Sequence, residues 1–326
     1  MQSAKLLNSL VETLNPYAGR PVYLDRLHGN HGDALIVMGA EQACRRAGCR
    51  IVDTPEEADA IFVVGGAGLS SVWGGAYCEL ERYYEGSLAA KPLVIFPSTL
   101  SFEASDFVDR INHRPGATVL FARERPSLER AQAVAWGPRV LLGLDDDTAF
   151  HLRDTDWLQS LKSRTRARHL LIVERRDAES LGGQPEATVR APSTLKRLAP
   201  MWLKRRVKLS SHMRSRTDTS FYRWAVEESE RSLGISPKDV PVVPIDISQQ
   251  SIVSFDRFLS LITDAAAVVT TRLHVGILAA LLDKPTVMVG GDRKYAKISG
   301  IYQQSMTEMD CVRYFDNPLD PEEKSA

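Results

Sequence analysis

The sequence has little cysteine and no surplus of charge. Its 326 residues include four cysteines, and none of them forms a Cys-x-x-Cys pair or a zinc-like spacing. A reducing compartment is therefore expected, and a structural metal is not. The 41 Lys and Arg residues balance 41 Asp and Glu residues, which gives a formal net charge of +0. No overall field attracts nucleic acid, so we expect no nucleic-acid partner.

Long hydrophobic runs are also missing. No apolar stretch approaches the length of a membrane span, and residues 1–14 lack the basic and then apolar order of a secretory leader. We therefore expect a cytoplasmic protein. The chain shows neither a P-loop nor a Gly-x-Gly-x-x-Gly fingerprint, and it shows no Ser-His-Asp or Cys-His nucleophile system.

The composition is that of a globular protein, with 44% hydrophobic and 25% charged residues. Short β-branched runs alternate with helical patterns along most of the chain, which predicts mostly parallel, wound sheets. The length suits two domains, and the Arg-rich passage 153–168 is the best candidate boundary. We predict two α/β domains, 1–160 and 161–326, that face each other across a cleft.

The stretch 267–282 predicts a strand, a sharp turn and a helix. Arg272 and His274 lie two residues apart at the turn, so on an extended backbone they would point to the same side while Leu273 enters the core. A guanidinium, an imidazole and a helix N-terminus suit a small oxyanion such as a phosphate or carboxylate. The alternative is that Arg272 pairs with a surface carboxylate and His274 only caps the helix.

A glycine-rich loop follows another predicted strand, at residues 65–68. It would allow a sugar to approach the backbone at Gly66 and Gly68, with Trp73 as a stacking surface. Tight packing of the backbone is the other explanation of such a loop.

Two acidic or histidine-containing motifs raise the question of a metal. The Asp run at 145–147 could bind magnesium, but a turn and helix cap before Thr148 is the favoured interpretation. His28 and His31 have no third ligand, so zinc is not expected.

One segment is strongly basic. Residues 190–216 contain nine Lys and Arg residues and no Asp or Glu, around an apolar-basic stretch at 201–209. Peripheral contact with an anionic membrane through residues 200–214 is one interpretation, and a solvated insertion is the other.

Five short motifs, in this order, resemble the polysaccharide pyruvyl transferase family. They are Gly-Asn-His-Gly-Asp at 29–33, Gly-Gly-Ala-Gly-Leu at 65–69 with Trp73, Ala-Arg-Glu at 122–124 with Ser127, Asp-Thr-Ala-Phe at 147–150, and Thr-Arg-Leu-His at 271–274. The resemblance runs from about residue 24 to 304. The chain departs from the family pattern in the basic insertion and in Ala67, which replaces a third consecutive glycine.

The resemblance implies a GT-B-like fold of two Rossmann-like domains. It also implies transfer of pyruvate from phosphoenolpyruvate to two hydroxyls of a glycan hexose, which gives a cyclic ketal and free phosphate in exopolysaccharide or cell-surface glycan synthesis. Phosphoenolpyruvate would be a co-substrate, with no cofactor and no metal. The acceptor would be an oligosaccharide or a lipid-linked glycan, and the latter would place the enzyme at the inner face of the plasma membrane.

The same resemblance implies that Arg272 and His274 take part in catalysis. From the chemistry of the donor we expect Arg272 to grip its carboxylate or phosphate, His274 to protonate its methylene carbon, and Asp33 or Glu124 to accept a hydroxyl proton. The donor's other anionic group would be held by Arg175, Lys294 or Lys297. The residues expected to line the acceptor side, in the first domain, are Asn30, Asp33, Gly66, Gly68, Trp73, Arg123 and Glu124.

Two other functions remain open for this sequence. A glycosyltransferase that uses a nucleotide sugar would share the architecture, because a fold does not fix an activity. A catalytically silent carbohydrate-binding protein would also keep the scaffold.

Overall fold

The computed structural model describes residues 6–26, 28–67, 80–102, 106–176, 213, 215–248, 250–291 and 296–319. The chain packs into two compact units. The first is formed within Met1–Gly29, Asp33–Thr155 and Lys294–Thr307, and the second within Asn30–Gly32, Asp156–Arg293 and Glu308–Ala326. The main passage between units thus lies a few residues before the predicted boundary at 160, and two short segments exchange units.

The first unit is built on a six-stranded parallel sheet in the order β2-β1-β3-β4-β5-β6. The strands are β1 (Pro21–Asp25), β2 (Arg50–Val52), β3 (Ala60–Val63), β4 (Leu93–Ser98), β5 (Thr118–Ala122) and β6 (Val140–Leu144). The helices of this unit are α1 (Leu10–Leu14), most of α2 (His31–Arg46), α4 (Gly86–Ala89), α5 (Phe107–His113), α6 (Arg125–Gln132) and α12 (Lys297–Ser305), with short 3-10 turns at Asn15–Tyr17, Glu81–Tyr83 and Thr148–Leu152.

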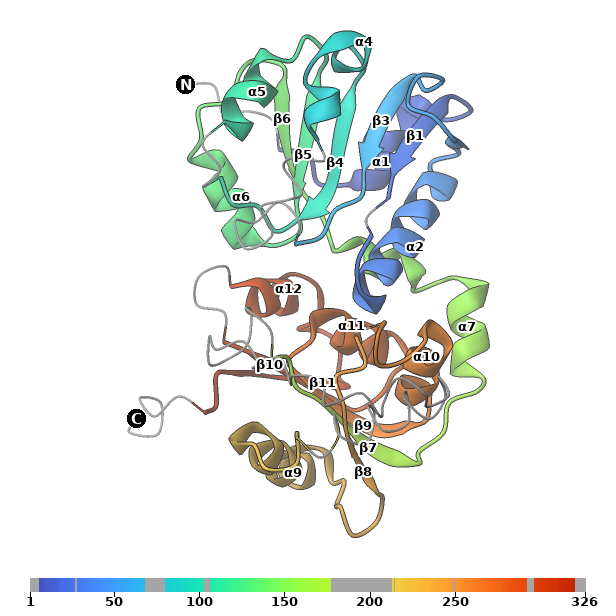
Figure 1. Cartoon of the computed structure of the whole chain (residues 1–326), viewed down its shortest axis with the longest axis vertical. Coiled ribbons are helices and arrows are strands. Elements are labelled where there is room, and N and C mark those ends of the chain that lie inside the picture. The colour runs from blue at the N-terminus through green and yellow to red at the C-terminus, as the bar shows by residue number, and fades with distance from the viewer. Residues whose placement is uncertain are drawn as a thin grey trace, which may run out of the picture. The chain divides into compact units, whose positions relative to one another are not determined.

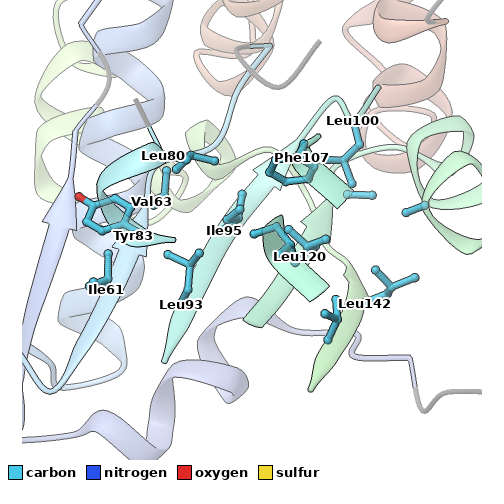
Figure 2. Close-up of a cluster of buried hydrophobic side chains, with 14 of the residues drawn as sticks. Ile61, Val63, Leu80, Tyr83, Leu93, Ile95, Leu100, Phe107, Leu120 and Leu142 are labelled. Carbon is cyan, nitrogen blue, oxygen red and sulfur yellow. The ribbon is translucent and has the colours of Figure 1, made fainter. Parts of the chain in front are cut away.

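Side chains that alternate along the strands build a core on each face of this sheet. On one face, Ile61, Leu93 and Ile95 pack with Phe107 of α5 and Leu128 of α6, as Figure 2 shows for most of this cluster. The opposite face carries the alternate residues of the same strands, and α1 and α2 cover it.

The second unit has a five-stranded parallel sheet in the order β11-β10-β9-β7-β8. Its strands are β7 (His169–Val173), β8 (Val242–Pro244), β9 (Ala265–Thr270), β10 (Thr286–Gly290) and β11 (Val312–Asp316). Its helices are α7 (Asp156–Lys162), α9 (Ser220–Leu233), α10 (Phe255–Thr263) and α11 (Leu273–Leu281). Helix α9 covers one face of the sheet, and α10 and α11 cover the other (Figure 1).

These two parallel sheets with helices on both faces confirm the predicted pair of Rossmann-like domains. In each sheet the first strand lies between the second and the third, so the connections leave it in opposite directions. The switch points lie between β1 and β3 in the first unit and between β7 and β9 in the second. Ligands of such sheets bind at the carboxyl ends of the strands beside a switch point.

Most predicted elements are present within a few residues of their expected ends, and three predictions need correction. The helical pattern from about residue 34 predicts Asp33 as its N-cap, but α2 already begins at His31, and the Asn30 side chain accepts the Gly32 N–H at 2.7 Å as a cap does. The passage taken as a polar boundary contains α7, and β11 was not predicted.

The described residues contain neither a membrane-spanning helix nor a cluster of metal ligands. None of their helices is long and apolar enough to cross a membrane. Within the same part of the chain, no three His, Cys, Asp or Glu side chains are grouped as metal ligands.

Candidate functional site

The corner between β9 and α11 lies at the switch point of the second sheet. Arg272 has an extended backbone at the N-cap of α11, and its N–H donates to the Thr270 hydroxyl at 2.9 Å. Leu273 begins the helix and is buried, as predicted, while His274 in the first turn is partly exposed. The change from extended to helical backbone happens at Leu273, so Arg272 and His274 are presented by two different backbone conformations.

The Arg272 side chain forms a buried ion pair with Asp246, which follows β8. Its Nε atom donates to Oδ1 of Asp246 at 3.2 Å, and its Nη2 atom donates to Oδ2 at 2.6 Å. Arg272 is 7% exposed and Asp246 is 0% exposed. This two-point contact fixes the plane of the guanidinium. The carboxylate pairing left open by the sequence is therefore real, and it is buried rather than on the surface.

Asp246 is held as a carboxylate by its neighbours. Burial alone would raise its pKa, but the charge and hydrogen bonds of Arg272, the charge of Arg216 and the Ser248 N–H together lower it below its usual value. The Ser248 N–H donates to Oδ1 of Asp246 at 3.2 Å.

More arginines gather at the end of β7. The Arg216 Nη1 atom donates to the Glu174 carbonyl at 2.8 Å, and Nε of Arg176 donates to the Glu174 carboxylate at 2.9 Å. The backbone N–H of Arg175 donates to the Thr271 hydroxyl at 2.6 Å, which ties the end of β7 to the corner after β9. In the described part of this edge, four arginines, Arg175, Arg176, Arg216 and Arg272, lie close to two carboxylates, those of Glu174 and Asp246. This group of side chains is suited to a small anion with more than one charge.

Arg216 was expected in a solvated or membrane-facing basic insertion. It is instead 2% exposed and lies beside Glu174 and Asp246. The rest of the stretch proposed for membrane contact, 200–214, lies outside the described residues apart from Met213.

The turn Asn30–Gly32 packs with the second unit, beside His274. A Cβ atom on Gly32 would lie 2.8 Å from Nδ1 of His274 and 3.0 Å from its Cβ, so only a glycine fits without movement. The residue before it, His31, is 4% exposed and donates its backbone N–H to the Ser248 carbonyl at 3.0 Å.

The predicted acceptor residues Arg123 and Glu124 lie in the first unit, in a closed network. Both are 0% exposed, and Nη1 of Arg123 donates to Asp147 at 2.7 Å. Glu124 accepts from Ser127 and from the Thr99 hydroxyl. Burial raises the pKa of Glu124, while Arg123 and Ser127 act against that rise. These contacts hold the ends of β5 and β6 and the start of α6 together.

The glycine loop after β3 is also tightly packed. A Cβ on Gly65 would lie 2.1 Å from the Pro97 carbonyl oxygen, and Gly66, with φ +136°, is bridged to Ser98 of β4. Close backbone approach thus accounts for Gly65, and the positive φ accounts for Gly66. The predicted cap at the Asp run is confirmed: Asp147 accepts the Ala149 N–H at 2.9 Å.

The remaining predicted residues are distributed as follows. Asp33 lies in the first turn of α2, and Lys297 begins α12 and is 9% exposed; both belong to the first unit. Gly68, Trp73 and Lys294 lie outside the described residues. Arg272, His274, Arg175 and Asn30 belong to the second unit. The sequence reasoning missed Asp246, although an acidic residue inside the apolar run 242–247 signals a buried carboxylate that needs a partner.

Comparison with solved structures supports the fold. A protein of uncharacterised function from Klebsiella pneumoniae subsp. pneumoniae aligns with a TM-score of 0.59 and 17% identity over 94% of this chain and 95% of that chain. The UDP-GlcNAc 2-epimerase of Methanocaldococcus jannaschii, solved with UDP-GlcNAc and UDP, aligns with a TM-score of 0.32 and 12% identity over 89% of this chain and 72% of that chain. The second likeness is too distant to carry an argument.

Comparison by sequence gives the family. No curated protein matches the chain significantly. The family model described as polysaccharide pyruvyl transferase matches residues 30–293, a range that includes the turn beside His274 and the whole arginine cluster. The chain belongs to the polysaccharide pyruvyl transferase family.

Proposed function

We propose that this protein transfers the pyruvyl group of phosphoenolpyruvate to two hydroxyls of a glycan hexose, forming a cyclic ketal and releasing phosphate. The observation that carries the proposal is the arginine cluster at the second sheet's switch point, in a chain of this family. Phosphoenolpyruvate carries a carboxylate and a phosphate, so it needs more than one cation. Such a donor complements a site in which arginines exceed carboxylates.

The donor would be held by the ends of β7, β8 and β9. Asp246 fixes the orientation of Arg272 and lies next to Arg216, so both guanidinium groups are pre-oriented before a ligand arrives. When the side chains of a site are already ordered, the free-energy cost of ordering them on binding is smaller. We assign one anionic group of the donor to Arg272 and the other to Arg216, with Arg175 and the N-terminus of α11 in support.

His274 would supply the proton that starts the reaction. Protonation of the donor's methylene carbon by His274 converts it to a methyl group and leaves C2 electron-poor. A sugar hydroxyl then adds to C2, and the proton that it loses restores the acid form of His274. The C2–O bond to phosphate then breaks, the second hydroxyl adds, and its proton leaves with the phosphate or with solvent. His274 suits the first step because an imidazole is a common general acid in enzymes and this one is partly exposed at the corner.

Titration calorimetry combined with a turnover assay tests this assignment. Phosphoenolpyruvate is titrated into wild-type protein and His274→Gln, and phosphate release is followed with methyl hexosides that offer 4,6- or vicinal diols. We expect the dissociation constant to stay within about threefold and turnover to fall by about 10²–10⁴.

The matched control is His113→Gln, because His113 is exposed on α5 in the first unit and contacts its own helix at the Asp109 carbonyl. It should behave as wild type. Absence of phosphoenolpyruvate binding by the wild-type protein would refute the donor, and turnover by His274→Gln within about threefold of wild type would refute the acid role.

A further inference from the structure

The turn between β1 and α2 leaves the first unit for three residues. β1 and the body of α2 pack with the first unit, whereas Asn30–Gly32 packs with the second. Because only three residues pack with the second unit, their position there depends on the contacts that they make themselves. The side chain with the most contacts therefore fixes the position of the backbone.

That side chain belongs to His31. Its ring centroid lies 5.3 Å from that of Phe258 and 5.6 Å from that of Phe255, both on α10. Its Nε2 atom is 2.9 Å from the Val253 carbonyl oxygen. Because a carbonyl only accepts, the ring carries a proton on Nε2. Buried and held on two sides, His31 has little freedom to move.

His31 is connected to His274 through the next residue, Gly32. The Gly32 backbone lies against the Nδ1 edge and the Cβ atom of His274, at separations that admit no further carbon atom. Asn30 accepts the Gly32 N–H at 2.7 Å and fixes the turn from the other side. The imidazole of His274 therefore has one wall formed by a peptide segment that His31 holds.

A series of hydrogen bonds also connects His31 to Arg272. The His31 N–H donates to the Ser248 carbonyl, and the Ser248 N–H donates to the carboxylate of Asp246. Asp246 in turn holds the guanidinium of Arg272. One buried histidine is thus connected to both residues of the Arg-Leu-His corner.

We propose that His31 is a positioning residue, which sets the orientation of the His274 ring through Gly32 and steadies Arg272 through Ser248 and Asp246. The catalytic consequence rests on the proposed function, while the structural consequence does not. The turn is therefore part of the donor side of the site.

The structural part is tested without any substrate. Protein labelled with ¹⁵N at its histidines is studied by NMR, and the ring signals of His274 are identified by their loss in His274→Gln. We expect Gly32→Ala, and separately His31→Phe, to move the His274 ring signals by more than a linewidth. His31→Phe keeps an aromatic ring beside Phe255 and Phe258 but removes the Nε2 donor to Val253.

The matched control for Gly32→Ala is Gly137→Ala. A Cβ there would meet its nearest atoms at 3.5–3.8 Å, which is ordinary contact, and the residue lies in the first unit. It should leave the His274 signals in place. Unchanged His274 signals in both Gly32→Ala and His31→Phe would overturn the inference, even if His274 proves catalytic.

Kinetics then test the consequence for the reaction. We expect Gly32→Ala and His31→Phe to reduce kcat by about 10²-fold, as a displacement of about 1 Å in a reacting group does, while KM for phosphoenolpyruvate changes little. His31→Gln, whose amide can still donate to Val253, should recover part of kcat. A loss confined to KM, or no recovery with Gln, would overturn the positioning role. A failure of His274→Gln to affect turnover would overturn the proposed function instead, without altering the NMR result.

Discussion

Asp246 is fully buried and holds the Nε and Nη2 atoms of Arg272. Asp246→Ala leaves that guanidinium buried without its carboxylate, so we expect a loss of about 3–5 kcal/mol in the free energy of unfolding, measured with urea. The control is Asp59→Ala, whose exposed pair with Arg20 should contribute no more than about 1 kcal/mol. Equal losses in the two variants would contradict a buried, structural pair.

The lowered pKa of Asp246 also predicts how stability depends on pH. The folded-state pKa lies below that of the unfolded chain, about 3.9, so the ionised carboxylate adds stability above that pH and the contribution is lost as the pH falls below it. We compare wild type with Asp246→Asn, which cannot ionise, by urea unfolding between pH 3 and pH 7. The advantage of the wild type should be constant from about pH 5 upward and shrink below about pH 4. An advantage that grows on acidification would show the opposite shift.

Single residues differ in how far the sequence reveals them. Arg272 and His274 can be found because a polar corner between two apolar runs is visible locally. The partner of Arg272 cannot, because Asp246 lies 26 residues earlier, after another strand. Arg216 was misjudged for the same reason: its neighbours in sequence are basic, but its neighbours in space are Glu174 and Asp246.

Helix α12 depends on a glycine where it meets α6. A Cβ on Gly300 would lie 2.8 Å from Cβ and 2.9 Å from Cγ of Glu124, whose carboxylate is held by Ser127 and Thr99. Gly300→Ala should therefore cost about 1–3 kcal/mol from overpacking, partly offset by a gain in helix propensity of at most about 1 kcal/mol. The measurement is the shift in urea unfolding, with Gly137→Ala as the control. A stabilised Gly300→Ala variant would mean that α12 is loosely packed.

The elements were predictable where packing follows a local period. The apolar runs 93–97, 140–144 and 285–289 predict strands, and β4, β6 and β10 begin and end within one residue of these bounds. Helix α7 was not predicted because polar residues surround its two buried leucines, Leu158 and Leu161, which form its inner face. The apolar run 240–247 predicts a strand of that length, but β8 ends at Pro244, and the residues after it bring Asp246 to Arg272.

For the chain as a whole, the alternation of strands and helices was enough to predict two wound sheets. It could not predict that residues 30–32 and 294–307 change units. Those crossings depend on contacts such as His31 with Phe258 and Gly300 with Glu124, and neither pair shows a period in the sequence. A domain boundary predicted from composition alone therefore cuts the chain at one place and misses the two short segments that pack with the other unit.

Because each unit has its own sheet and core, a donor that binds only the second unit should stabilise that unit selectively. Hydrogen exchange of the whole chain measures this, with and without phosphoenolpyruvate. At a donor concentration of 100 times the dissociation constant, the stabilisation is about 2.7 kcal/mol, or about 100-fold slower exchange through global opening. We expect that slowing in β7, β9 and β10 of the second unit and little change in β3 and β5 of the first. Slowing in the first unit alone would place the donor there, and the switch point between β7 and β9 would lose its assigned ligand.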